Sequence, residues 1–193
     1  MKGLGLVRFR LFFYSFSLQG MKNSLERRSQ ARSFALKHHG KQQYGSCPYS
    51  VHLDAVAELV QQYGETAVVL AYLHDVVEDT PASLGEIENA FGTLVADCVA
   101  ILTDEPGKDR QERKKKTYRK MAQVSGTTEI ALVVKAADRL ANMRACVADK
   151  KEKLLAVYRQ EYPFFAQAVY RPKICDELWI QLVDLVELIK KEL

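Results

Sequence analysis

The sequence predicts an all-α fold, and three observations support that prediction. After residue 20, apolar residues recur three or four positions apart, the spacing that places them on one face of a helix. No stretch alternates apolar and polar residues for long enough to indicate a half-buried strand. Four prolines, Pro48, Pro81, Pro106 and Pro172, fall at breaks in the helical pattern, where helices usually end.

The predicted helices follow one another with short breaks. They cover residues 24–39, 51–63, 66–78, 84–91, 93–103, 110–123, 128–147, 150–170 and 175–191. Capping boxes at Asn23–Glu26 and Ser83–Glu86 mark the starts of the first and fourth helices. Pro163 predicts a kink or a break near Tyr162. The last helix carries the stripe Leu178, Leu182, Leu185 and Ile189, which predicts core packing or the face of a homo-oligomer.

The first residues differ in character from the rest. A basic start is followed by the short aromatic stretch 11–16, which is too short to span a bilayer and has no small-residue cleavage site after it. We therefore expect residues 1–22 to be a dispensable extension and residues 23–193 to form the domain. A weak membrane or export signal is the alternative.

Composition limits the class of protein. A chain of 193 residues with 48% hydrophobic and 27% charged residues predicts one globular domain with no membrane partner. The net charge of +4 permits an anionic substrate without indicating nucleic acid as a partner. The four cysteines are scattered, which is typical of reduced thiols in a cytoplasmic protein.

The segment from Ala71 to Thr80 concentrates polar groups inside an apolar stretch. On the predicted helix His74 shares a face with Glu78, and Asp75 shares one with Asp79. Buried charges are costly unless they are paired or bind a metal. An adjacent His and Asp offer one nitrogen and one oxygen ligand, so the segment predicts part of a divalent-metal site.

Two further segments supply the remaining ligands. His52 lies at the start of the 51–63 helix, and Asp138 lies on the 128–147 helix. Lys135 and Asn142, three before and four after Asp138, lie near the same face of that helix. Two imidazoles and two carboxylates suit Mn²⁺, Fe²⁺ or Zn²⁺ better than Ca²⁺.

These segments carry a resemblance to a known family. In order along the chain stand His38-His39-Gly40-Lys41, Pro48-Tyr49-Ser50-Val51-His52, Leu73 to Thr80, Phe91-Gly92-Thr93-Leu94-Val95 and Val134 to Asn142. This order resembles the HD-domain metal-dependent phosphohydrolases, and most closely the hydrolase domain of the RelA/SpoT alarmone enzymes and their small stand-alone (p)ppGpp hydrolase relatives. The resemblance implies an HD-domain helical bundle with a central metal site.

The resemblance also implies a role for each residue. The metal ligands would be His52, His74, Asp75 and Asp138, and the metal would be Mn²⁺ or another divalent transition ion. Glu78 and Asp79 would be catalytic, since they would hold and polarise the attacking water. The substrate would be bound by Lys135, Asn142, Gln43, Tyr44 and Tyr162.

One part of the pattern departs from the family. Where the alarmone hydrolases carry a basic residue, usually Arg followed often by Lys, this chain has Gln43 and Tyr44. Leu53 also stands where the family usually has a Pro. Tyr44 could stack on a base, or the substrate could differ from (p)ppGpp.

The residues also allow structural interpretations. The four metal-ligand candidates could form a polar network without a metal, and Glu78 and Asp79 could cap a helix or pair with Arg139. His38 and His39 are expected at the surface or in a supporting role. The basic run 108–120 could be a solvated helix face, a nonspecific nucleic-acid patch, or a source of contacts to substrate phosphates.

The leading hypothesis is therefore a metal-dependent phosphohydrolase that acts on a nucleotide, with (p)ppGpp 3′-pyrophosphohydrolysis as the expected activity. The first rival is an HD hydrolase of another nucleotide or deoxynucleotide phosphate. The second rival is a non-catalytic HD module that senses nucleotides or binds nucleic acid.

Overall fold

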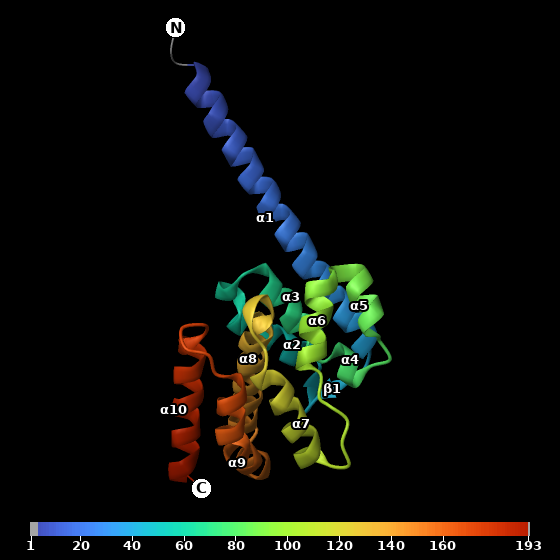
Figure 1. The fold of residues 1–193 in the computed structure, drawn as a ribbon, viewed down its shortest axis with the longest axis vertical. Coiled ribbons are helices and arrows are strands. Elements are labelled where there is room, and N and C mark those ends of the chain that lie inside the picture. The colour runs from blue at the N-terminus through green and yellow to red at the C-terminus, as the bar shows by residue number, and fades with distance from the viewer. Residues whose placement is uncertain (1–3, 193) are drawn as a thin grey trace.

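The chain folds into helices joined by short turns, as the all-α prediction requires (Figure 1). The computed structural model describes the backbone of residues 4–192 and the side chains of residues 20–189. Its helices are α1 (Leu4–His39), α2 (Ser50–Leu59), α3 (Glu65–Leu73), α4 (Val76–Asp79), α5 (Leu84–Phe91), α6 (Thr93–Leu102), α7 (Arg110–Ala122), α8 (Ile130–Ala148), α9 (Glu152–Val169) and α10 (Asp176–Glu192). Two 3₁₀ turns, η1 (Gln61–Tyr63) and η2 (Gly126–Glu129), precede α3 and α8.

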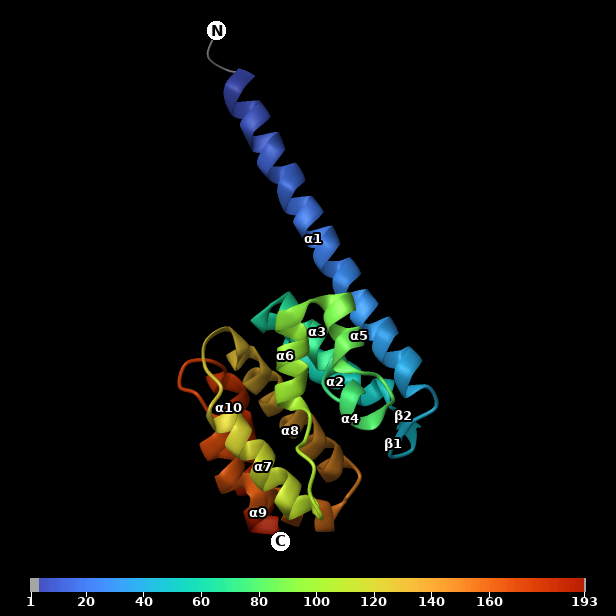
Figure 2. The ribbon, with the colours of Figure 1, turned by 45° about the vertical axis from the view of Figure 1, so that its right-hand side comes forward.

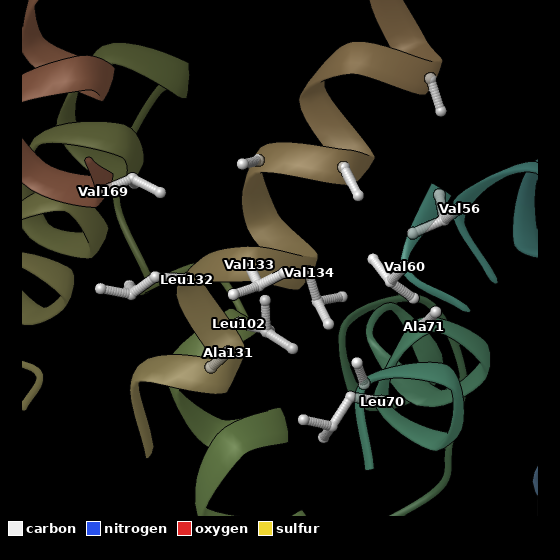
Figure 3. Close-up of a cluster of buried hydrophobic side chains, with 14 of the residues drawn as sticks. Val56, Val60, Leu70, Ala71, Leu102, Ala131, Leu132, Val133, Val134 and Val169 are labelled. Carbon is white, nitrogen blue, oxygen red and sulfur yellow. The ribbon is translucent and has the colours of Figure 1, made fainter. Parts of the chain in front are cut away.

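Helix α8 forms the centre of the bundle and packs against α2, α3, α6, α9 and α10 (Figure 2). Its apolar side chains face different neighbours on successive turns, so nearly the whole circumference is buried. In Figure 3, Val133 and Val134 of α8 lie between Leu70 of α3 and Val169 of α9. Because α8 also carries Asp138, this packing fixes one predicted ligand at the core of the molecule.

The stripe on α10 faces the core rather than a partner. Leu178, Leu182 and Ile189 are each at most 2% exposed, and Leu185 packs against the buried cluster. These side chains are therefore packed against the core of the same chain, as the core-packing interpretation predicted.

The predicted start of the first helix was wrong. Helix α1 already begins at Leu4 and passes through the Asn23–Glu26 capping box without interruption (Figure 1). A capping box satisfies free N–H groups only where a helix begins, so inside a helix it has no such role. The second capping box is confirmed, because Ser83 and Glu86 bond reciprocally at the start of α5.

The predicted helix 66–78 divides at His74 and Asp75. The Nδ1 atom of His74 donates to the backbone oxygen of Ala71 at 2.7 Å, which is the carbonyl that the N–H of Asp75 would otherwise use. The side chain therefore competes with the backbone and ends α3 at Leu73. Asp79 N and Thr80 N resume the helical bonds in α4.

Two further details differ from the sequence pattern. A short hairpin joins β1 (Gln43–Tyr44) to β2 (Cys47–Pro48), with Tyr44 opposite Cys47 and a positive φ of 62° at Gly45 in the turn. Strands this short give no alternation that a sequence could display. Pro163 lies inside α9 without splitting it, so of the predicted kink or break near Tyr162 the break was wrong.

Candidate metal centre

Four predicted ligands come together from three parts of the chain. His52 lies in α2, His74 and Asp75 form the junction between α3 and α4, and Asp138 lies in α8. His52 and His74 are only 2% and 1% exposed, and Asp138 is 7% exposed. The break in the predicted 66–78 helix thus occurs at the two residues that join this cluster.

The ligand-type atoms converge on one point. Nε2 of His52 lies 3.2 Å from Nε2 of His74, which lies 2.9 Å from Oδ2 of Asp75. Oδ1 of Asp138 lies 3.4 Å from Nε2 of His52 and 3.7 Å from Nε2 of His74. Atoms bound at about 2.1 Å to one metal ion are roughly 3.0–3.4 Å apart. The spacings therefore fit the edges of a coordination shell.

The hydrogen positions on His74 indicate a need for positive charge at the centre. Because Nδ1 bonds to the carbonyl of Ala71, it carries the hydrogen, and Nε2 of the neutral ring presents a lone pair. That lone pair faces the carboxylate of Asp75. Two lone pairs repel unless a proton or a metal ion lies between them. An imidazole oriented in this way is the usual metal ligand.

The pKa shifts of the cluster residues also indicate a need for positive charge at its centre. Burial lowers the pKa of His74, but Asp75 and Asp138 outweigh burial and raise this pKa to about 10. Burial also opposes protonation of His52, yet hydrogen bonds to the same two carboxylates raise its pKa. Burial raises the pKa values of Asp75 and Asp138, but the neighbouring cations, with His74 and Lys135 foremost, hold them well below their usual range. The pocket thus favours positive charge, which a divalent cation supplies.

Lys135 lies within this acidic environment. It is 5% exposed, and its Nζ lies 3.2 Å from Oδ2 of Asp138. Burial lowers the pKa of Lys135, but the charges of Asp138, Asp75 and other nearby carboxylates raise it above the usual value. The side chain therefore does not snorkel to solvent. It neutralises the ligand oxygen that faces away from the histidines.

Glu78 lies on α4, three residues after Asp75, and is exposed to solvent. Its Oε2 accepts from the backbone N–H of Asp104 at 2.9 Å. Burial and the charge of Asp104 raise the pKa of Glu78. Arg139, the alternative partner, instead donates to Glu161 at 3.0 Å and to Tyr118 at 2.9 Å. Glu78 is thus not neutralised by Arg139.

Sequence reasoning assigned no role to two residues that support the cluster, Tyr49 and Gln42. The hydroxyl of Tyr49 donates to Oδ2 of Asp75, and its ring stacks on His39 at a centroid distance of 4.4 Å. Gln42 bonds His39 Nδ1 at 2.8 Å and donates to Asp79 Oδ2 at 2.9 Å. His39 therefore supports the site without being a ligand, as predicted. The signal for Tyr49 was its place in the Pro48–His52 segment that carries the family resemblance.

The predicted substrate-binding residues separate into four groups. Tyr44 and Asn142 lie beside the ligands, since the Tyr44 ring stacks on His52 at 4.7 Å and Asn142 donates to Asp138. Gln43 is exposed on the hairpin next to Tyr44. Tyr162 packs against the hydrophobic core from α9. Lys135 is held at Asp138, as described above.

Half of the basic residues in the run 108–120 are paired within the molecule. Lys114 binds Asp104 at 2.8 Å, Lys116 binds Glu112 at 2.8 Å and Lys120 binds Glu105 at 2.7 Å. Arg110 binds Glu161 on α9 at 2.7 Å. A groove of about 950 Å³ is lined by residues of α7 and α9 such as Lys115, Arg119 and Phe164. None of the metal-ligand candidates lines this groove.

Among the residues that the structure describes, no helix is both long enough and apolar enough to cross a membrane.

Comparison with known proteins matches residues 31–168 to the family model described as "HD domain". A relative from Synechocystis sp., named probable guanosine-3′,5′-bis(diphosphate) 3′-pyrophosphohydrolase, is 35% identical over 162 residues, which cover 81% of this chain and 21% of that protein. A relative from Haemophilus influenzae, named guanosine-3′,5′-bis(diphosphate) 3′-pyrophosphohydrolase, is 32% identical over 140 residues. These residues cover 69% of this chain and 20% of that protein. The chain spans about a fifth of the length of these relatives.

Solved structures share the fold. One is described as a metazoan ortholog of SpoT that hydrolyses ppGpp and plays a role in starvation responses. It has a TM-score of 0.68 and 23% identity, with 84% of this chain and 94% of that chain covered. A protein from Listeria monocytogenes EGD-e has a TM-score of 0.59 and 26% identity, and the match covers 72% of this chain and 99% of that chain.

Proposed function

Because the chain belongs to the HD-domain family, we propose that it is a metal-dependent phosphohydrolase that acts on a nucleotide. The proposed reaction is 3′-pyrophosphohydrolysis of (p)ppGpp, with Mn²⁺ as the metal. The names of the Synechocystis and Haemophilus relatives support this choice of substrate. The cytoplasm is the proposed location.

One observation carries the proposal. The Nε2 atoms of His52 and His74, 3.2 Å apart, meet the carboxylates of Asp75 and Asp138 in a largely buried cluster. This donor set of two imidazoles and two carboxylates is suited to Mn²⁺, Fe²⁺ or Zn²⁺. When bound, such an ion polarises a phosphoryl oxygen and lowers the pKa of a bound water.

Glu78 and Asp79 are the proposed catalytic residues. Glu78 has a raised pKa and is not neutralised by Arg139, so its carboxylate is suited to accept the proton of the attacking water. Asp79 is oriented by Gln42, whose amide donates to its Oδ2 at 2.9 Å. Lys135 keeps Asp138 ionised, and therefore able to act as a ligand, throughout the neutral range.

The part of the site expected to select the substrate departs from the family pattern at Gln43 and Tyr44. Arg presents a planar fork that stacks on a base and clamps a phosphate, whereas Gln43 and Tyr44 carry no charge. These two residues favour a second candidate, an HD hydrolase of another nucleotide phosphate. The non-catalytic alternative is disfavoured because Glu78 and Asp79 are both present at the cluster and half of the basic residues in the run 108–120 are paired internally.

The test is hydrolysis by the purified protein with added Mn²⁺. The substrates are guanosine and adenosine 3′-pyrophosphates and a set of deoxynucleoside triphosphates. Release of pyrophosphate from the 3′ position, lost in His74→Ala, is the expected result. Hydrolysis of the triphosphates alone would instead establish the second candidate. No hydrolysis of any substrate by a protein that binds Mn²⁺ would favour the non-catalytic module.

A further inference from the structure

Tyr44 contacts the metal centre twice. The β1–β2 hairpin brings this half-buried side chain over the cluster, where its ring stacks on His52 with an interplanar angle of 20° and a centroid distance of 4.7 Å. Its hydroxyl donates to Oδ1 of Asn142 at 2.8 Å. One residue of a short loop therefore reaches both α2, which carries His52, and α8, which carries Asn142.

Asn142 transmits the second contact to a ligand. Because its Oδ1 accepts from Tyr44, its Nδ2 points toward Asp138 and donates to Oδ1 at 2.5 Å. That oxygen is the one that faces Nε2 of His52 and Nε2 of His74. The other oxygen, Oδ2, is held by Lys135 at 3.2 Å. Both oxygens of Asp138 are thus held by hydrogen bonds or ion pairs. Tyr44 sets the orientation of the Asn142 amide, and this amide holds Oδ1 of Asp138.

We propose that Tyr44 is a positioning residue of the metal centre, acting on Asp138 through Asn142 and on His52 through ring stacking. The proposal rests on the metal site of the proposed function. Groups that orient the ligands of a metal typically contribute about 10- to 100-fold to its affinity. A neutral tyrosine suits this role, because a cationic side chain against His52 would repel the metal ion.

This role differs from direct substrate binding. Both polar atoms of the Asn142 amide are already engaged, one with Tyr44 and one with Asp138, and one face of the Tyr44 ring lies against His52. The hydroxyl of Tyr44 therefore acts on the metal centre before any nucleotide is bound. Its effect is measurable as metal affinity in the absence of substrate.

The experiment is titration of the metal-free protein with Mn²⁺ by calorimetry, without substrate. Tyr44→Phe removes the hydroxyl and keeps the ring. The matched control is Tyr170→Phe, which removes a tyrosine hydroxyl that contacts Asp176 at 3.3 Å, away from the cluster. We expect Tyr44→Phe to weaken Mn²⁺ binding about tenfold and Tyr170→Phe to leave it unchanged.

A double-mutant cycle separates the pathway from a general loss of stability. If the hydroxyl acts through Asn142, Tyr44→Phe weakens Mn²⁺ binding in the wild-type background and has little further effect in Asn142→Ala. Equal effects in both backgrounds would overturn the pathway. Unchanged Mn²⁺ affinity in Tyr44→Phe would overturn the proposal, even if thermal unfolding of the metal-free variant showed a lower midpoint. Failure of the wild type itself to bind Mn²⁺ would instead reject the metal site and with it the proposed function.

Discussion

At the scale of single residues, charge balance decides what the cluster can do. Asp75 and Asp138 are ionised in a buried pocket, and nearby positive charge comes from Lys135 and from protons on the histidines. Burying unbalanced carboxylates is costly. A divalent ion releases the histidine protons and balances the same charges, so metal binding and proton release are linked at this site.

Replacing a ligand should therefore abolish metal binding. His74→Ala removes a nitrogen that faces three other ligand atoms, and we expect the variant to be purified without stoichiometric metal. Elemental analysis checks this result. His38→Ala is the control, because His38 packs on Phe34 and contributes no atom to the cluster. Equal metal content in wild type and His74→Ala would contradict the assignment.

Replacing Glu78 should separate binding from chemistry. Glu78→Gln keeps a hydrogen-bond acceptor for the N–H of Asp104 but cannot accept a proton. We expect normal Mn²⁺ binding and a loss of turnover of about 100-fold or more. Glu58→Gln, at an exposed position of α2, is the matched control and should be fully active. Wild-type turnover in Glu78→Gln would show that the carboxylate is structural.

The same residue predicts a pH dependence. The pKa of Glu78 is raised by burial and by Asp104, and only its ionised form accepts a proton. Activity should therefore fall as the pH drops through a value above the ordinary pKa of 4.5. A pH–rate profile measured at saturating Mn²⁺ checks this. The acidic limb should be missing from the residual activity of Glu78→Gln, and an unchanged limb would assign it to another group.

Sequence could identify the candidate ligands but not the residues that support them. His52, His74, Asp75 and Asp138 stand at recognisable spacings within apolar helices. Gln42 and Tyr49 have partners 37 and 26 residues away along the chain, and their residue types are common in loops. Such contacts follow from the packing of the hairpin against α4 and α8, which no local pattern encodes.

At the scale of elements, side chains override helix propensity at the site. The segment 66–78 has the apolar spacing of one helix, yet His74 takes the carbonyl of Ala71 and divides it. Periodicity reports which face is buried, but it does not report a side chain that replaces a backbone bond. The sequence therefore predicted the helix correctly except at the two residues where the site requires a break.

Pro163 gives an element-scale prediction. It lies at an exposed position inside α9, where proline removes one backbone hydrogen bond without stopping the helix. Proline costs about 3 kcal/mol more than alanine in a helix interior. Its restriction of the unfolded chain offsets up to about 1 kcal/mol. We expect Pro163→Ala to raise the free energy of unfolding by about 2 kcal/mol, balancing these two terms.

Chemical denaturation measures that change. Pro172→Ala is the control, since Pro172 lies between α9 and α10 and removes no helical bond, so no comparable gain is expected. A Pro163→Ala variant no more stable than the wild type would indicate that the surrounding packing already accommodates the proline ring.

At the scale of the whole molecule, the order of helices follows from the sequence because each is bounded by a turn residue or a cap. The extent of α1 does not follow in this way. Residues 4–22 contain no proline, so the helix that starts at Leu4 continues into the domain past the predicted start at residue 24. The first part of α1 projects away from the other helices (Figures 1 and 2).

Several described side chains of α1 contact the rest of the domain. The guanidinium of Arg27 donates to Glu65 and to the backbone oxygen of Phe91, and Ala31 and Ala35 are fully buried. Arg32 binds both oxygens of Asp54 at 2.7 Å. By contrast, Met21 and Leu25 are 62% and 63% exposed. The contacts of Arg27, Ala31, Arg32 and Ala35 all lie after residues 1–22, the segment that we expect to be dispensable.

Deletion of residues 1–22 should leave the free energy of unfolding and the Mn²⁺ affinity unchanged, because none of the contacts of Arg27, Ala31 or Arg32 is removed. Deletion of residues 1–32 removes all three and is the matched comparison, and it should be clearly destabilised in chemical denaturation. If the shorter deletion were insoluble or lost Mn²⁺ binding, the projecting part of α1 would be required for folding or assembly. If the longer deletion were as stable as the wild type, the contacts of α1 would not stabilise the domain.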